Sequence, residues 1–157
     1  QSNRLNEVMY LPQEIDDTLE HEILDELHEC NEEEKGEILS TLYRLGSEPK
    51  RLARIEETTL SPGELRKLMI ALAVQKPLSL LILDEPTRNF SPLSGPEVRG
   101  ILKRFPGTII SVSHDRKYIS EVCNKIYEMT AEGLTVSEQA GYTGGSAASV
   151  AKPCGTT

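Results

Sequence analysis

The stretch SLLILDEPTRNF, residues 79–90, decides the fold that this sequence predicts. Five of the six residues from Leu78 to Leu83 are apolar, and they lead directly into two carboxylates, Asp84 and Glu85. A short apolar run that ends at turn residues is typical of a buried strand. The sequence therefore predicts a core strand that delivers two acids to its carboxyl end.

A second apolar stretch, TIISVS at 108–113, predicts a neighbouring strand. Helical patterns at about 96–104 and 116–123 precede and follow it. Strand, helix and strand in this order indicate a right-handed crossover within a parallel sheet that is covered on both faces. The expected fold class is therefore α/β.

The polar residues that follow these two strands predict a site. Ligands of parallel sheets bind outside the carboxyl ends of the strands, where Asp84 and Glu85 follow one strand and Ser113 and His114 end the next. Such a group could hold Mg²⁺ and orient a water molecule. Two plainer interpretations stay open: Asp84 could cap a turn, and Asp115 could be the N-cap of the helix that begins near Arg116.

The first half of the chain predicts a short strand followed by helices. EVMYLP at 7–12 is typical of a strand, and the apolar spacing from Ile15 to Leu27 predicts one face of a helix. A second helix is expected from Glu33 to about Leu45, with Gly46 as its stop.

LSPGELRKLMIALAVQKP at 60–77 predicts the best-defined helix in the chain. Ser61 is a natural N-cap, Pro62 suits the first helical position, and Glu64 would complete a capping box. Near the C-terminus, residues 125–136 predict a hairpin that turns at Glu132 and Gly133.

Composition limits the function classes. The chain has 157 residues and a net charge of −8, much of it between Glu14 and Glu37. This argues against nonspecific wrapping of nucleic acid, although a local basic patch could contact RNA. No apolar run approaches the length of a membrane span. The three cysteines lack metal-ligand spacing, so we expect reduced structural thiols in a cytoplasmic protein.

The motifs taken together resemble the nucleotide-binding domain of the ATP-binding cassette (ABC) ATPases over about residues 4–136. YLPQE resembles the family's Q-loop, LSPGE its signature motif, LLILDEP its Walker B strand, TRNFSP its D-loop region and ISVSHD its switch-histidine strand. The order of the five motifs is that of the family. The Glu that ends LSPGE, DEPT, and VSHDRKYI are most similar to the ABC-F group, whose members carry two cassettes, lack membrane domains and commonly act on ribosomes.

The resemblance implies a role for each matching residue. Asp84 would bind Mg²⁺ through water, and Gln13 would sense the metal and the γ-phosphate of ATP. Glu85 would polarise the hydrolytic water, and His114 would steady the γ-phosphate. The nucleotide-binding residues at the helix start, Ser61, Gly63 and Glu64, would face the ATP of a partner cassette, where a helix N-terminus suits a phosphate; LSPGE could equally be only a well-built helix start.

The sequence also departs from the family pattern. No segment matches the phosphate loop G-x-x-x-x-G-K-[ST], and GYTGGSAAS in the tail is expected to be a linker. Pro62 stands where the family usually has glycine, and Ser91 where it usually has aspartate. The chain is therefore expected to be a fragment that neither binds nor hydrolyses ATP at useful rates by itself.

The expected organisation has four parts: residues 1–14 as strand and Q-loop, 15–59 as an acidic helical subdomain, 60–137 as the signature helix with part of the ATPase core, and 138–157 as a flexible tail. The expected partners are a second cassette and the ribosome. Two alternatives stay open: the ATP-binding subunit of a membrane transporter, which would dock on membrane subunits without inserting itself, and a non-catalytic interaction module.

Overall fold

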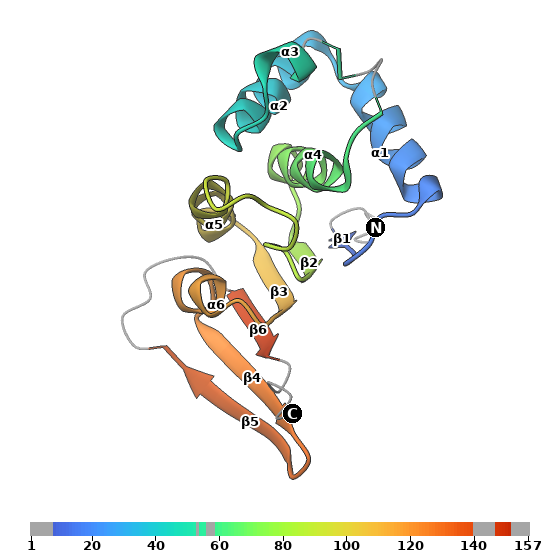
Figure 1. The fold of residues 1–157 in the computed structure, drawn as a ribbon. Coiled ribbons are helices and arrows are strands. Elements are labelled where there is room, and N and C mark those ends of the chain that lie inside the picture. Colours follow the sequence, from blue (N-terminus) through green and yellow to red (C-terminus); the bar gives the residue numbers. More distant parts are fainter. Residues whose placement is uncertain (1–7, 53, 56–58, 140–146, 152–157) are drawn as a thin grey trace. The chain divides into compact units, whose positions relative to one another are not determined.

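The computed structural model of the chain describes residues 8–52, 54–55, 59–139 and 147–151. These residues form two compact units. The α/β unit contains residues up to 13, 78–88 and those from 98 onward; the helical unit contains 14–77 and 89–97. Figure 1 shows the helices and strands of each unit.

The α/β unit is built on a six-stranded sheet with the order β1-β2-β3-β6-β4-β5. Its strands are β1 (Val8–Leu11), β2 (Leu80–Asp84), β3 (Thr108–Ser113), β4 (Lys125–Thr130), β5 (Gly133–Glu138) and β6 (Ala147–Ala151). All neighbouring pairs are parallel except β4 and β5, which form an antiparallel hairpin. The α/β class predicted from the sequence is confirmed.

The first three strands are in close register. Leu11 of β1 lies beside Leu83 of β2, and Asp84 at the end of β2 lies beside Val112 of β3. Because the strands are parallel, their carboxyl ends reach the same edge of the sheet. The tight turn into β3 brings Gly107 so close to β2 that an added Cβ would lie 2.7 Å from the Leu78 carbonyl oxygen.

The expectation that both faces of this sheet are covered was wrong in part. Leu81, Leu83 and Ile109 are buried, whereas Ile110 is 41% exposed. The burial along β2 and β3 accordingly alternates instead of being continuous. Successive residues of a strand point to opposite faces, so in the described part of the chain one face is better covered than the other.

Two helices accompany the strands of this unit. α5 (Gly95–Lys103) starts at the unit boundary and buries Val98, Ile101 and Leu102. α6 (Arg116–Val122) follows β3 directly and buries Tyr118 and Val122. The Asp115 side chain accepts hydrogen bonds from the backbone N–H groups of Lys117 and Tyr118, so the predicted N-cap is confirmed.

The C-terminal part of the sheet contains one element that the sequence analysis missed. The predicted hairpin is present as β4 and β5, with Thr130 paired with Gly133 beside the turn. The expected flexible tail, however, contributes β6, which pairs in parallel with both β3 and β4. A run of small residues has low strand propensity, so its sequence does not predict a strand. The pairing positions that β3 and β4 offer between them explain why this segment becomes β6. GYTGGSAAS lies mostly outside the described residues.

The helical unit contains α1 (Asp17–Glu29), α2 (Glu32–Arg44), the short α3 (Pro49–Leu52) and α4 (Pro62–Gln75). α4 packs against α1 and α2, which explains why it belongs to this unit and not with β2, as the sequence analysis had grouped it. Asn31 and Glu34 form a capping box at the start of α2. Gly46, with a φ of +84°, ends α2 as predicted.

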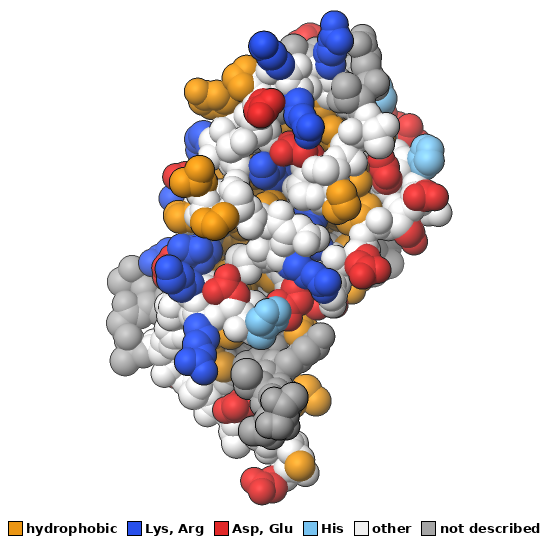
Figure 2. Space-filling view, in the orientation of Figure 1, with side chains coloured by type: hydrophobic (Ala, Val, Ile, Leu, Met, Phe, Trp, Pro, Cys, Tyr) orange, Lys and Arg blue, Asp and Glu red, His pale blue; other side chains and the backbone are white. Residues whose placement is uncertain are grey.

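Each of these helices buries an apolar stripe. The buried side chains include Ile23 and Leu27 of α1, Ile38 and Leu42 of α2, and a longer run on α4. The exposed faces are acidic in α1 and α2, and Figure 2 shows acidic side chains gathered along α1. Among the described residues no helix is both long enough and apolar enough to span a bilayer.

Candidate active site

The carboxyl ends of β2 and β3 bring together the residues that the sequence analysis selected there. Asp84 is the last residue of β2, and Glu85 continues the pairing because its backbone N–H donates to the Val112 carbonyl at 2.8 Å. Ser113 ends β3, and His114 follows it. The predicted convergence of acids and imidazole on one edge of the sheet is therefore what the structure shows.

Glu85 has an unusual backbone. Its φ is +50°, in the left-handed region that residues other than glycine seldom adopt. Such a conformation costs on the order of 1–2 kcal/mol and persists only where neighbouring groups enforce it. The bond to Val112 holds one side of the residue, and the Arg88 N–H donates to the Glu85 carbonyl at 3.0 Å on the other.

The Glu85 side chain is directed toward His114. Its Oε1 lies 2.8 Å from Nδ1 of His114. The Glu85 side chain is 6% exposed, and that of His114 is 77% exposed. An ionised carboxylate can only accept, so Nδ1 is the donor in this pair. The buried acid therefore fixes one nitrogen of a ring whose remainder reaches solvent.

A second contact joins the same two segments. Thr87 Oγ1 donates a hydrogen bond of 2.8 Å to Oδ2 of Asp115. The other carboxylate oxygen of Asp115 accepts the Lys117 N–H at 2.9 Å and the Tyr118 N–H at 3.2 Å. Asp115 therefore caps α6 and also binds the loop that follows β2.

These contacts set the acidity of Asp115. Burial by itself raises the pKa of the carboxyl, but the hydrogen bonds from Thr87, Tyr118 and Lys117 favour the ionised form and, with the charge of Arg99, lower the pKa below its ordinary value. Arg99 is held in place by an ion pair with Glu121, at 2.7 Å. Asp115 is therefore charged throughout the neutral range.

Asp84 is suited to a metal ion that is held mostly by other ligands. Among the described residues no cluster of three or more His, Cys, Asp or Glu side chains could hold a metal. Mg²⁺ needs no such cluster, because it commonly keeps several waters and binds one or two carboxylates together with substrate phosphates. A half-buried carboxylate at a strand end, as at Asp84, fits that donor set.

Gln13 follows β1, two residues beyond the Leu11 that pairs with Leu83. Its segment therefore leaves the sheet at the same edge as Asp84 and Glu85.

The other predicted nucleotide-binding residues lie in the helical unit, at the start of α4. Ser61 is the N-cap, and its Oγ accepts the Glu64 N–H at 3.3 Å. A Cβ on Gly63 would lie 3.1 Å from the Asn89 carbonyl oxygen, so the close approach of these two segments favours glycine. Packing therefore explains the glycine at position 63 whether or not this residue binds a ligand.

Glu64 does not complete the predicted capping box. Its carboxylate instead accepts a hydrogen bond from Ser47 Oγ at 2.7 Å and pairs with Lys67 Nζ at 3.0 Å. The bond from Ser47 and the ion pair with Lys67, three residues further along α4, hold the side chain away from the Ser61 backbone. Glu64 connects α4 to the segment after α2 in this structure.

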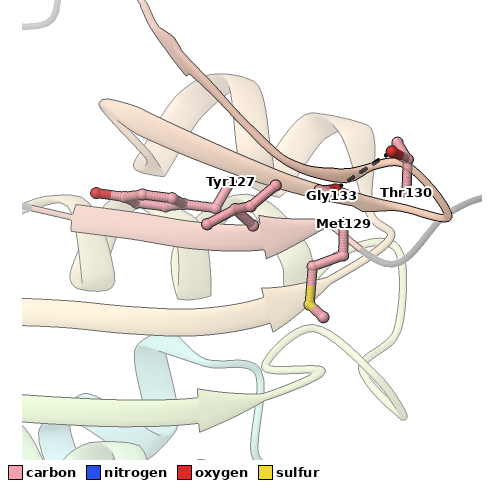
Figure 3. Close-up of a pocket in the computed structure, with 5 residues that line it drawn as sticks. Tyr127, Met129, Thr130 and Gly133 are labelled. Atoms are coloured by element: carbon pink, nitrogen blue, oxygen red, sulfur yellow. Dashed lines mark hydrogen bonds between the residues drawn. The ribbon is translucent and has the colours of Figure 1, made fainter.

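A shallow apolar pocket of about 490 Å³ lies elsewhere in the α/β unit, on the hairpin. Figure 3 shows Tyr127, Met129, Thr130 and Gly133 around it; Leu134 completes the lining. The lining contains no Lys, Arg or His side chain, so the pocket offers no positive charge to a phosphate group. The polar site at the ends of β2 and β3 is the better candidate for chemistry.

Cys30 shows no sign of a reactive thiol. Burial raises its pKa, and the charges of Glu34 and Glu26 raise it further. Its Sγ donates to the Glu26 carbonyl at 3.3 Å. Cys123 is fully buried. Both are typical of structural thiols.

The fold is similar to that of a protein of known structure. A solved structure described as "Structure of ATP binding subunit of ABC transporter" superposes with a TM-score of 0.54 and 23% identity, over 76% of this chain and 53% of that one. At this identity the match establishes the fold alone.

A model of the ABC transporter family matches residues 1–88, which is more than half of the chain. The chain belongs to this family. It is 35% identical over 86 residues to ATP-binding protein Uup of Caulobacter vibrioides, covering 55% of the chain and 14% of that protein. It is 37% identical over 75 residues to ABC transporter F family member 2 of Arabidopsis thaliana, covering 48% of the chain and 11% of that protein. The chain therefore spans about a seventh of the length of the first of these relatives and about a ninth of the second.

Two features of the site were not anticipated. Thr87 served only as part of a subfamily motif, and Asp115 only as a helix cap, yet the two form a hydrogen bond across 28 positions of sequence. No local pattern reveals such a pair, because it depends on the register of β2 against β3. The left-handed backbone of Glu85 was also unexpected, since this conformation ordinarily calls for glycine.

Proposed function

We propose that this chain is part of an ABC-F-type ATPase, in which Mg-ATP hydrolysis drives a conformational change. The observation that carries the proposal is the buried Glu85 carboxylate held 2.8 Å from His114 at the carboxyl ends of parallel strands. A carboxylate that is shielded from bulk water and held by one partner is suited to accept a proton from an attacking water. Catalysis of phosphoryl transfer otherwise rests on positioning and charge.

Each residue has a defined task in this proposal. Glu85 orients the water and takes its proton. His114 donates from Nδ1 to Glu85, and its protonated form leaves Nε2 to donate to a phosphate oxygen. Asp84 would hold Mg²⁺ through water, and Gln13 would sense the metal and the γ-phosphate of ATP. Magnesium, when bound, supplies neutralisation of the phosphate charge.

The start of α4 serves a different nucleotide in the proposal. Ser61 Oγ and the N–H groups near Gly63 are available to a phosphate of the ATP held by a second cassette. Glu64 supports this end of α4 through Ser47 and Lys67. Pro62 removes one donor from the helix start, so the contact depends on Ser61 and Gly63.

Ribosome association in the cytoplasm belongs to the same proposal, and a basic segment of the helical unit supports it. Arg44, Lys50, Arg51 and Arg54 are exposed within eleven residues of one another. Figure 2 shows Lys and Arg side chains gathered where α3 lies in Figure 1. A local basic patch on an acidic chain is suited to RNA phosphates. Co-sedimentation with ribosomes that weakens as salt is raised would support this partner, whereas co-purification with membrane subunits would favour a transporter.

The ATPase proposal is tested in a chimaera that joins residues 8–157 to the preceding part of a complete ABC-F ATPase domain, which supplies a phosphate loop. We expect Glu85→Gln to lower kcat by at least about 100-fold, in line with loss of a general base. The matched control, Glu138→Gln, changes an exposed acid of β5 and should leave kcat unchanged. Unchanged turnover in Glu85→Gln would refute the proposed base.

The 157-residue chain by itself should show no such turnover, since it lacks the backbone cradle that grips phosphate. Clear Mg-ATP hydrolysis by this chain, lost in Glu85→Gln, would overturn the expected inactivity and retain the role of Glu85.

A further inference from the structure

We propose that Thr87 and Asp115 are positioning residues, and that their hydrogen bond clasps the loop after β2 to the start of α6 so that Glu85 stays in its left-handed conformation beside His114. The Thr87–Asp115 clasp is this hydrogen bond, 2.8 Å long. Its catalytic meaning rests on the proposed function, but the clasp itself is a property of the folded chain.

The Glu85 backbone is strained. A glutamate with φ of +50° would relax if the loop around it were free to move. The Val112 carbonyl accepts the Glu85 N–H from the β3 side, and the Arg88 N–H donates to the Glu85 carbonyl within the loop. Both bonds act on the backbone of Glu85, so an anchor between this loop and the segment of His114 would add to them.

Thr87 lies two residues beyond Glu85. Its hydroxyl reaches Asp115, the residue directly after His114, at 2.8 Å. The two residues to be aligned, Glu85 and His114, thus each lie next to one end of the clasp. A bond of this kind fixes the separation of the two loops and not merely the path of one of them.

Hydrogen bonds hold the Asp115 carboxylate in one orientation. One of its carboxylate oxygens is occupied by two backbone N–H groups of α6, and its own N–H donates to Ser113 Oγ at 3.1 Å. The lowered pKa of Asp115 agrees with an acceptor that stays ionised. A charged acceptor strengthens the bond from Thr87, because hydrogen bonds to ionised groups exceed neutral ones.

The His114 side chain is mostly exposed. With a side chain that is 77% exposed, the imidazole has little packing to orient it. Its tautomer is set by the single bond to Glu85, as is usual for a histidine next to a carboxylate. A small displacement of Glu85 would therefore release the ring.

The test reads the ring nitrogens of His114 in the 157-residue chain without nucleotide, by long-range ¹H–¹⁵N correlation at a pH where the ring is neutral. A His114→Gln variant assigns the signal among the three histidines. In the unsubstituted chain the Nδ1–H tautomer should predominate. In Thr87→Val its ratio to the Nε2–H tautomer should fall about three- to tenfold, as expected for the loss of one net hydrogen bond.

Three further variants make the result specific. Thr87→Ser keeps the hydroxyl and should restore the ratio. Thr135→Val removes an exposed hydroxyl on β5 and should leave it unchanged. If Thr87→Val fails to fold, Asp115→Ser replaces it and should lower the ratio likewise, because serine still caps α6 but has no second oxygen for Thr87.

A ratio that is unchanged in Thr87→Val, or that falls equally in Thr135→Val, would overturn the proposal. Because the ring is observed without ATP, failure of the proposed ATPase function would leave this result intact.

Discussion

The ends of β2 and β3 and the hairpin of β4 and β5 belong to one sheet. Polar side chains are buried at the strand ends, whereas apolar side chains are exposed on the hairpin. At the strand ends Glu85 is 5% exposed and Ser113 of β3 is fully buried. On the hairpin Met129, Leu134 and Val136 are each more than half exposed. Buried polar groups need partners, which the strand ends supply; exposed apolar groups need none, but they form a surface suited to another segment or molecule.

This contrast separates the candidate active site from the exposed apolar hairpin. Holding Glu85 in a strained backbone and away from water is unfavourable by itself, so the surrounding hydrogen bonds must offset it. The apolar hairpin stores no such strain. Substitutions should therefore disturb the two regions by different mechanisms and by different amounts.

The largest difference is expected from one substitution made in both regions. Leu81→Ala removes a fully buried side chain from β2 and should lower the free energy of unfolding by about 2–5 kcal/mol. Leu134→Ala on β5, where the side chain is 58% exposed, should change it by less than about 0.5 kcal/mol. Urea denaturation measures both. Equal losses would show that the hairpin is covered in solution.

A smaller effect should follow from Gly107→Ala. The added Cβ would meet the backbone carbonyl oxygens of Leu78 and Ser79 at 2.7 and 2.8 Å, so the start of β3 must shift. We expect a loss of about 1–3 kcal/mol, as in other overpacked sites.

The control for Gly107→Ala is Gly36→Ala on α2, where nothing lies within 4 Å of the new Cβ. It should stabilise the chain by about 0.5–1 kcal/mol, because alanine is the better helix former. Thermal unfolding distinguishes the two signs. A neutral Gly107→Ala would mean that the approach of β2 and β3 is looser than the structure indicates.

The smallest predicted effect depends on pH. The pKa of Asp115 is lowered in the folded chain, so its ionisation contributes stability above the unfolded pKa of about 3.9, and this contribution disappears as the pH falls through the folded value. Asp115→Asn should therefore be less stable than the unsubstituted chain by about 1 kcal/mol at neutral pH, and the difference should vanish in acid.

Asp25→Asn on the exposed face of α1 is the matched control and should cost less than about 0.5 kcal/mol at any pH. Urea titrations at a series of pH values measure the three chains. A difference for Asp115→Asn that does not change with pH would contradict the assigned ionisation.

Local patterns were sufficient for the elements that carry the site. The apolar runs of β2 and β3 and the N-caps Ser61 and Asp115 each depend on a few neighbouring residues, and each is present as predicted. Where a side chain had a competing distant partner, the local expectation was wrong. Glu64 turns to Ser47, 17 positions away, instead of the Ser61 backbone. Residues 147–151, in the segment expected to be flexible unless it docks, pair with β3 and β4.

The sequence by itself determined the α/β class, the order of the motifs, and the delivery of Asp84, Glu85 and His114 to strand ends, because hydrophobic periodicity and capping act over a few residues. Only the tertiary structure decided that Glu85 is strained, buried and bound to His114, and that Thr87 meets Asp115. The physical reason is register: the pairing of β2 with β3 sets which side chains meet across 28 or 29 positions of sequence, and no local propensity encodes that distance.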